Sequence, residues 1–267
     1  MEKGVPIRSI SRSIAVMQAI NRDGPLSMMD IANASHVPYP TACRIVQTLL
    51  YEGLIEREPA RKRYRPTALV QSLSYGYQSH DELVTRARPH IVGLTKSVGW
   101  PVSLVTRVGQ CMIVRDSTHA LTSMTLNNYY PGYALPLLEC ASGLAHLAFC
   151  SAEERRALLA GIRESDVPVN HNTMQLLEGG QLVDEIRREG IATNGRNRHT
   201  LNPGKTSSIA APVFANGQVA GVMTLIFFAS AIKMTEAVRT YAPMLKRVAA
   251  DIGLELESGQ PVDLRAA

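Results

Sequence analysis

The stretch that decides the fold of the first third of the chain is residues 27–57, SMMDIANASHVPYPTACRIVQTLLYEGLIER. Ser27 is a favoured N-cap with Asp30 three residues later as its acidic partner, so a short helix is predicted to begin there. After a tight connection, Pro40 opens a second helix, and Gly53 ends it at the position where glycine is favoured. Two helices joined by three or four residues, the second ending in glycine, are the signature of a helix-turn-helix.

Another helix is predicted before this stretch, because apolar residues recur there every three to four positions. A Gly-Pro pair directly after Asp23 ends it. The residues that we expect on its buried face are Ile10, Ile14, Met17 and Ile20.

The second helix of the motif has two faces of different chemistry. The residues that we expect on its core face are Cys43, Val46, Leu49 and Leu50. Ile45 is expected off that face, together with hydrogen-bonding side chains that can reach base edges and phosphates in a major groove. These candidate DNA-contacting residues are Tyr39, Thr41, Arg44, Gln47 and Thr48.

A short hairpin is predicted after Gly53, because residues 54–57 and 64–67 change to the pattern of strands. Between them lies a basic tip that contains Arg61, Lys62 and Arg63. A run of charge is usually a solvated face, but this run follows a helix-turn-helix directly. We therefore interpret the hairpin as a wing whose tip meets phosphates or a minor groove.

The net charge of +5 over 267 residues is uninformative as an average but is local in the chain. Residues 1–80 hold ten Lys and Arg against six Asp and Glu, a balance of +4. The rest holds 18 basic and 17 acidic residues, a balance of +1. A basic first third is what a small nucleic-acid-binding module would give.

The rest of the chain predicts an α+β, sensor-like domain, because hairpin-linked strands are mixed with helices. The predicted strands are residues 101–107, 111–116, 122–126, 207–214 and 219–228. The predicted helices are residues 81–98, 142–149, 176–189 and 235–256, and one capped by Ser151. The expected domains are a winged helix-turn-helix at 1–67, a linker helix at 68–80, the sensor-like domain at 81–257 and a flexible tail at 258–267.

No sequence feature marks a membrane, a disulfide framework or a cofactor. The N-terminus lacks a signal-peptide core, the longest apolar stretch is too short to span a bilayer, and the four cysteines lie far apart. We therefore expect a cytoplasmic protein with no membrane contact. There is no phosphate-binding glycine motif, so no cofactor is expected.

Catalysis and metal binding are also not expected. Ser142 and His146 lie four apart on one helix, but no third group is evident that would orient the histidine. Cysteine and histidine side chains could bind a metal only if the fold brought them together, because no ligand spacing is present in the sequence. The residues considered are Cys140, His119, His171 and His199.

The order and spacing of these segments resemble the IclR family of bacterial transcriptional regulators over about residues 8–257. The segments that carry the likeness are residues 12–14, 53–57, 135–137, 141–143, 189–190 and 208–213. Within the family, the chain looks most similar to activators of hydroxyphenylpropionate and other aromatic-acid catabolism. That closer likeness rests on residues 114–119, 141–150 and 229–231.

The resemblance implies a GAF-like effector-binding domain, a dimer that often pairs to a tetramer, and control of one operon by one small metabolite. It implies that backbone N–H groups of Ala141 and Ser142 hold the effector carboxylate, at a helix N-terminus where an anion is favoured. The other family pocket positions fall on Met124, Asn127, Leu135, Asn194, Thr206 and Ser208. Arg196, where the chain departs from the family pattern, could add a charge-assisted bond to the carboxylate.

The favoured hypothesis is therefore a homodimeric, effector-controlled regulator that reads a pseudo-palindromic operator in double-stranded DNA. A small carboxylate, expected to be aromatic, would change the spacing of the DNA-binding domains or their contact with RNA polymerase. Because only 5% of the residues are aromatic, we expect the pocket to grip the acid through backbone amides, polar side chains and aliphatic walls. The alternatives are an enzyme that processes a small ligand on the α+β domain, and a protein adaptor without a ligand.

Overall fold

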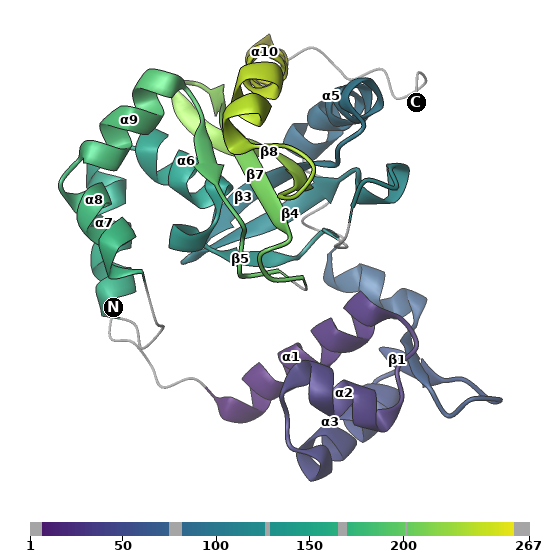
Figure 1. Cartoon of the computed structure of the whole chain (residues 1–267). Helices are drawn as coiled ribbons and strands as arrows, with labels where there is room; N and C mark the ends of the chain where they lie inside the picture. Colours follow the sequence, from purple (N-terminus) through teal and green to yellow (C-terminus); the bar gives the residue numbers. More distant parts are fainter. Residues whose placement is uncertain (1–6, 75–81, 126–128, 165–169, 201, 259–267) are drawn as a thin grey trace. The chain divides into compact units, whose positions relative to one another are not determined.

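A computed structural model describes residues 7–74, 82–125, 129–164, 170–200 and 202–258. The chain divides into two compact units, residues 1–81 and 82–267, and each is described by itself. The first unit is a winged helix-turn-helix and the second is an α+β domain (Figure 1), which confirms the predicted fold class. The finer domain boundaries at residues 67 and 257 stay predictions.

Local sequence signals set several of the helix ends in the first unit. The helices are α1 (Arg8–Asp23), α2 (Met28–Ser35) and α3 (Tyr39–Tyr51). The Ser27 side chain accepts the backbone N–H of Asp30, and the Asp30 carboxylate accepts the backbone N–H of Ser27, so the predicted capping box is formed. At the end of α3, Gly53 has a φ of +72°, and its N–H and that of Leu54 close a Schellman motif on α3.

Two expectations about burial in this unit are wrong. Ile10 and Ile14 are 54% and 53% exposed, whereas Val16, which was not expected on the buried face, is buried together with the expected Ile20. Ile45, expected to point outward from α3, belongs to the core. Periodicity shows that a helix has an apolar face but not which face is buried. Val16 and Ile14 lie on two different faces of α1, and the face with Val16 is the buried one.

The wing is a two-stranded antiparallel hairpin of β1 (Ile55–Arg57) and β2 (Tyr64–Pro66). An isolated bridge between Leu26 and Tyr64 ties it to the segment before α2. The segment expected to be a linker helix begins as a 3₁₀ helix, η1 (Ala68–Leu73), and residues 75–81 lie outside the described part of the chain.

The second unit is built on one antiparallel sheet in the order β5-β4-β3-β8-β7-β6. Its strands are β3 (Val102–Val108), β4 (Cys111–Ser117), β5 (Ala134–Pro136), β6 (Ala192–Asn194), β7 (Thr206–Ala215) and β8 (Gln218–Phe228). Its helices are η2 (His119–Leu121), η3 (Leu137–Glu139), α5 (Glu82–Val98), α6 (Ala141–Phe149), α7 (Ala152–Arg163), α8 (His171–Glu178), α9 (Gln181–Glu189) and α10 (Met234–Ser258).

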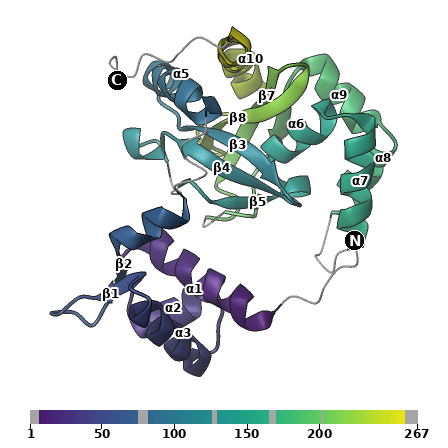
Figure 2. The ribbon, with the colours of Figure 1, turned by 180° about the vertical axis from the view of Figure 1, so that it is seen from behind.

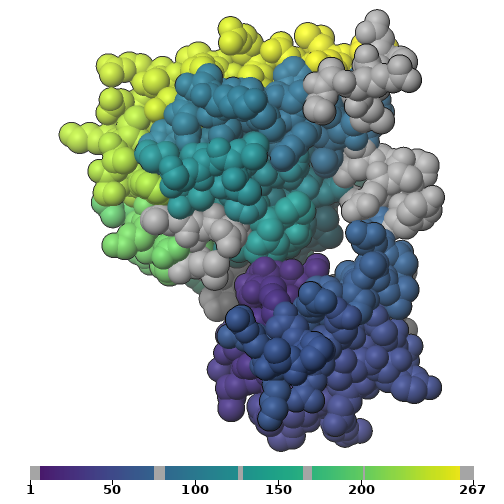
Figure 3. All heavy atoms as spheres, turned by 90° about the vertical axis from the view of Figure 1, so that its right-hand side faces the viewer, coloured from purple at the N-terminus to yellow at the C-terminus, as the bar shows by residue number. Residues whose placement is uncertain are grey.

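Helices cover both faces of this sheet (Figures 1 and 2). On one face α5 and α10 lie side by side, as their adjoining surfaces in Figure 3 also show. On the other face α6 packs against the sheet, with α7, α8 and α9 around it. Alternate residues of β8 divide between the two cores: Leu225 joins α5 and α10, whereas Val222 joins α6.

Three predicted elements of this unit need correction. Residues 122–125 form no strand, and the neighbour of β4 is instead β5. The helix expected over 176–189 is two helices, α8 and α9, separated at Gly179 and Gly180. Residues 192–194, where no strand was predicted, form the short edge strand β6. Within the described part of the chain, no helix is both long and apolar enough to cross a membrane.

Candidate functional site

The outward face of α3 presents the side chains predicted to contact DNA. Tyr39, Arg44, Gln47 and Thr48 are exposed, and Thr41 is half-buried. The Thr48 hydroxyl donates to the carbonyl oxygen of Arg44 at 3.1 Å, so it is partly engaged by its own helix. Arg44 and Gln47 therefore offer the long hydrogen-bonding side chains that a major-groove reader uses.

The wing tip exposes Arg61, Lys62 and Arg63 to solvent. The tip is closed by a 2.8 Å hydrogen bond from the N–H of Glu58 to the carbonyl oxygen of Arg63, and Lys62 has a φ of +50°. Below the tip, Arg65 forms an ion pair with Glu56 across the two strands, at 2.6 Å. The paired Arg65 is thus a weaker candidate for phosphate contact than the tip residues.

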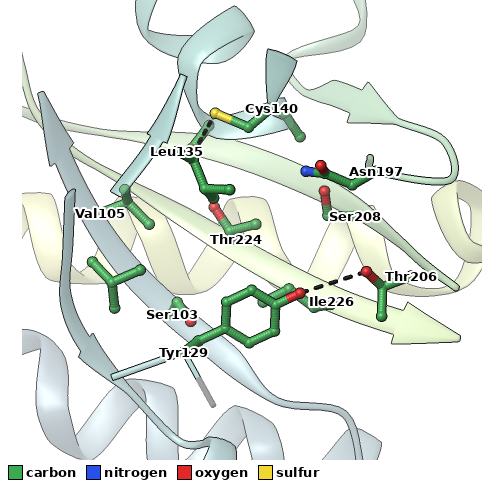
Figure 4. Close-up of a pocket in the computed structure, with 13 residues that line it drawn as sticks. Ser103, Val105, Tyr129, Leu135, Cys140, Asn197, Thr206, Ser208, Thr224 and Ile226 are labelled. Atoms are coloured by element: carbon green, nitrogen blue, oxygen red, sulfur yellow. Dashed lines mark hydrogen bonds between the residues drawn. The ribbon is translucent and has the colours of Figure 1, made fainter. Parts of the chain in front are cut away.

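A cavity lies inside the second unit, between the sheet and the N-terminus of α6 (Figure 4). It is lined by Ser103, Val105, Val114, Tyr129, Leu135, Cys140, Ala141, Ser142, Asn197, Thr206, Ser208, Thr224 and Ile226. Among these described lining residues there is no Lys, Arg, His, Asp or Glu. Any anion in the cavity must therefore be held by neutral donors.

The N-terminus of α6 supplies such donors. The first backbone N–H groups of a helix have no intrahelical acceptor, which here applies to Ala141 and Ser142. Cys140 is the N-cap, and its sulfur accepts the N–H of Gly143 at 3.3 Å. Burial raises the pKa of the Cys140 thiol to about 11, so at neutral pH this cap carries no negative charge that would repel an acid.

The remaining polar groups of the cavity are hydroxyls and one amide. The Thr224 hydroxyl is buried and has no hydrogen-bond partner among the described residues. Figure 4 shows Tyr129 with its hydroxyl directed to that of Thr206, at 3.5 Å. The side chain of Asn197 accepts the N–H of His199 at 2.7 Å. A buried hydroxyl without a partner costs free energy, which a ligand that pairs with Thr224 would recover.

The cavity is tight as it stands. Its volume is about 20 Å³, whereas a single water needs ~10–15 Å³. A ring-sized acid therefore requires its lining side chains to move. Tyr129 is the largest of them; its hydroxyl lies 3.5 Å from that of Thr206, and its ring packs edge-on against Tyr133.

The structure brings five of the predicted effector-binding residues to the cavity: Leu135, Ala141, Ser142, Thr206 and Ser208. Three others do not line it. Met124 is 39% exposed, Asn194 donates to the carbonyl oxygen of Glu139 at 3.3 Å, and Arg196 is exposed with a φ of +51°. Asn127 lies outside the described residues.

Sequence reasoning missed eight lining residues. They are Ser103, Val105, Val114, Tyr129, Cys140, Asn197, Thr224 and Ile226. Alternation within strands could have suggested some of them, because Ser103 and Val105 are two apart, as are Thr224 and Ile226. Ser208 pairs with Ile226 and Ser103 pairs with Thr224, so these four side chains lie on the same face of the sheet.

A winged helix-turn-helix joined to an α+β domain with an internal cavity defines a class of ligand-responsive DNA-binding proteins. Sequence comparison identifies the IclR helix-turn-helix domain at residues 9–59 and the C-terminal domain of bacterial transcriptional regulators of the IclR type at residues 75–254. The chain therefore belongs to the IclR family of bacterial transcriptional regulators. Because this family consists of regulators and not enzymes, the enzyme alternative is set aside.

Individual relatives are distant. The HTH-type transcriptional regulator TsaQ1/TsaQ2 of Comamonas testosteroni is 22% identical over 160 residues, which cover 59% of this chain and 57% of that protein. The structure of a transcriptional regulator from Rhodococcus sp. RHA1 superposes with a TM-score of 0.67 at 22% identity, over 94% of this chain and 98% of the other. An IclR homolog of Microbacterium hydrocarbonoxydans complexed with 4-hydroxybenzoate superposes with a TM-score of 0.65 at 19% identity, over 93% and 98%.

Proposed function

We propose that this regulator is controlled by a small, aromatic carboxylic acid that binds in the cavity of the second unit, and that it governs a catabolic operon. The observation that carries the proposal is the N-terminus of α6, which borders a cavity with no charged side chain among its described lining residues. The backbone N–H groups of Ala141 and Ser142 and the positive end of the helix dipole favour a carboxylate there. The neutral thiol of Cys140 does not oppose it.

The rest of the cavity supports an acid with a flat apolar body and a hydroxyl. Aliphatic walls come from Val105, Val114 and Ile226, and the unpartnered hydroxyl of Thr224 offers a hydrogen bond. The 4-hydroxybenzoate bound to the Microbacterium hydrocarbonoxydans homolog has this chemistry. Leu135, Thr206 and Ser208 would complete the contacts. Met124, Asn127, Asn194 and Arg196, which the family resemblance also implies, remain proposed contacts of the effector.

For DNA, we propose that α3 enters a major groove with Tyr39, Thr41, Arg44, Gln47 and Thr48 facing the bases and phosphates. The wing would place Arg61, Lys62 and Arg63 on the backbone or in the minor groove. A homodimer would read a pseudo-palindromic operator, and two dimers would pair to a tetramer. The acid would bind one quaternary arrangement better than the other, with a coupling of ~1–3 kcal/mol that changes the spacing of the DNA-binding units or their contact with RNA polymerase. We place this activity in the cytoplasm.

Two measurements on the full chain test this proposal. A thermal-shift screen with benzoate, 4-hydroxybenzoate, phenylacetate and hydroxyphenylpropionate should give a concentration-dependent rise in Tm for at least one acid. Binding of labelled DNA from upstream of the gene should weaken steeply with salt. If no acid shifts Tm, the effector proposal fails, and if no salt-dependent binding occurs, the proposed DNA interface fails.

A further inference from the structure

Three potential metal ligands meet where α6 ends and α7 begins, at the opposite end of α6 from the cavity. His146 lies in the last turn of α6, Cys150 is its C-cap, and Glu154 lies in the first turn of α7. An imidazole nitrogen, the sulfur and a carboxylate oxygen all lie within 4.8 Å of one another. His146 and Cys150 are buried and Glu154 is half-buried.

The cluster is arranged around a positive charge. The guanidinium of Arg107 donates to Nε2 of His146 at 3.2 Å and to Oε1 of Glu154 at 3.0 Å. In the tautomer in which Nε2 accepts from Arg107, its 3.2 Å approach to Oε1 of Glu154 brings two acceptors together. A cation that contacts both atoms makes such an approach favourable. The guanidinium now fills that role.

Cys150 adds a ligand that the guanidinium does not use. Among the described residues, the hydrogen bond that its sulfur makes is a long one, 3.5 Å to the carbonyl oxygen of Leu147. A thiolate, an imidazole and a carboxylate together match Zn²⁺ and exclude Mg²⁺ and Ca²⁺, which prefer oxygen ligands.

We propose that His146, Cys150 and Glu154 form a binding site for a thiophilic divalent cation such as Zn²⁺, which takes the place of the Arg107 guanidinium. On binding, the Cys150 thiol releases its proton to solvent and a water completes the coordination. Arg107 is 28% exposed and lies at the end of β3, so its side chain can turn outward. Sequence spacing leads to the expectation of no metal, because none of the four residues considered there as metal ligands belongs to this cluster, and His146 is considered only as a catalytic base.

The test uses the full chain stripped of metal with a chelator and dialysed at neutral pH against Zn²⁺, or titrated with Co²⁺ as a spectroscopic probe. We expect saturable binding of one ion per chain and an absorption band from cobalt–thiolate charge transfer. Cys150→Ser should abolish the band and His146→Gln should weaken binding at least tenfold. The matched control, Cys43→Ser on α3 in the other unit, should leave both unchanged.

The Arg107→Gln variant distinguishes a metal-binding site from a cluster of ion pairs that has only a structural role. Removing the competing guanidinium should tighten binding of Zn²⁺ at least tenfold. Weaker binding in this variant, no saturable binding by the wild-type chain, or an unchanged cobalt spectrum in folded Cys150→Ser would each overturn the proposal. Circular dichroism establishes folding. If a ligand variant does not fold, the wild-type and Arg107→Gln measurements decide the outcome.

Discussion

Gly143 of α6 packs directly against the backbone of Leu137: a Cβ at this glycine would lie 2.7 Å from the carbonyl carbon of Leu137 and closer still to its oxygen. The contact fixes the first turn of α6 against η3, and that first turn borders the cavity. The position of the proposed carboxylate site therefore depends on a glycine that does not itself line the cavity.

Gly143→Ala should destabilise the chain and impair effector binding together. The new methyl group must displace backbone, and such overpacking costs ~1–3 kcal/mol or more. The free energy of unfolding from urea titrations measures the first effect, and the Tm shift with the best acid of the screen measures the second. Gly93→Ala in α5 is the control, because a Cβ there meets nothing within 4 Å. It should be neutral or stabilise by up to ~1 kcal/mol. Equal effects of the two substitutions would contradict this account of Gly143.

Thr224→Val should stabilise the protein in the absence of effector. It replaces a buried hydroxyl that has no partner among the described residues by a methyl group of similar size, which removes a desolvation cost of ~1–3 kcal/mol. The matched control is Thr95→Val, because the Thr95 hydroxyl is also buried but bonds to that of Thr118 at 2.6 Å. That control should lose stability. Urea denaturation of both variants gives the sign of each change in the free energy of unfolding. A loss of stability in Thr224→Val would show that the hydroxyl of Thr224 has a partner.

Neutralising the wing tip should weaken DNA binding and reduce its dependence on salt. Each phosphate contact contributes ~0.9 to the slope of log K against log salt. The triple variant Arg61→Gln, Lys62→Gln, Arg63→Gln should therefore lower the slope by up to ~3, as measured by fluorescence anisotropy between low and moderate salt. Arg65→Gln should change it less, because Arg65 is already paired with Glu56. An unchanged slope in the triple variant would remove the wing from the interface.

Local signals predicted the DNA-binding unit well, because its elements are set by neighbours in sequence. The capping box of Ser27 and Asp30 and the glycine stop at Gly53 involve residues no more than a few positions apart. The error at Ile10 and Ile14 is of another kind. Which of two adjacent faces of α1 is buried depends on where α2 and α3 pack, and that information lies outside α1 itself.

The α+β unit was predictable in class but not in its edges or its cavity. Both β5 and β6 have three residues, too few to show the alternation of polar and apolar side chains that predicts a strand. They are strands because they pair with longer neighbours, β5 at Met112 of β4 and β6 at Ile209 of β7. Effector positions carried over from the family placed five residues at the cavity. Thr224 was missed because its place there follows from its pairing with Ser103 across β3 and β8, over more than a hundred residues of chain.

The thiol of Cys140 should be unreactive at neutral pH in the folded protein. Thiolates, not thiols, react with alkylating reagents, and burial raises the pKa of Cys140 to about 11. Because the raised pKa favours the protonated form in the folded state, the thiolate fraction should stay small until the pH approaches 11. Iodoacetamide labelling followed by peptide mass spectrometry at pH 7.5 should modify the half-exposed Cys43 while leaving Cys140 intact. Rapid labelling of Cys140 in the folded chain would mean that α6 begins with an ionised cap, which would oppose a carboxylate at Ala141 and Ser142.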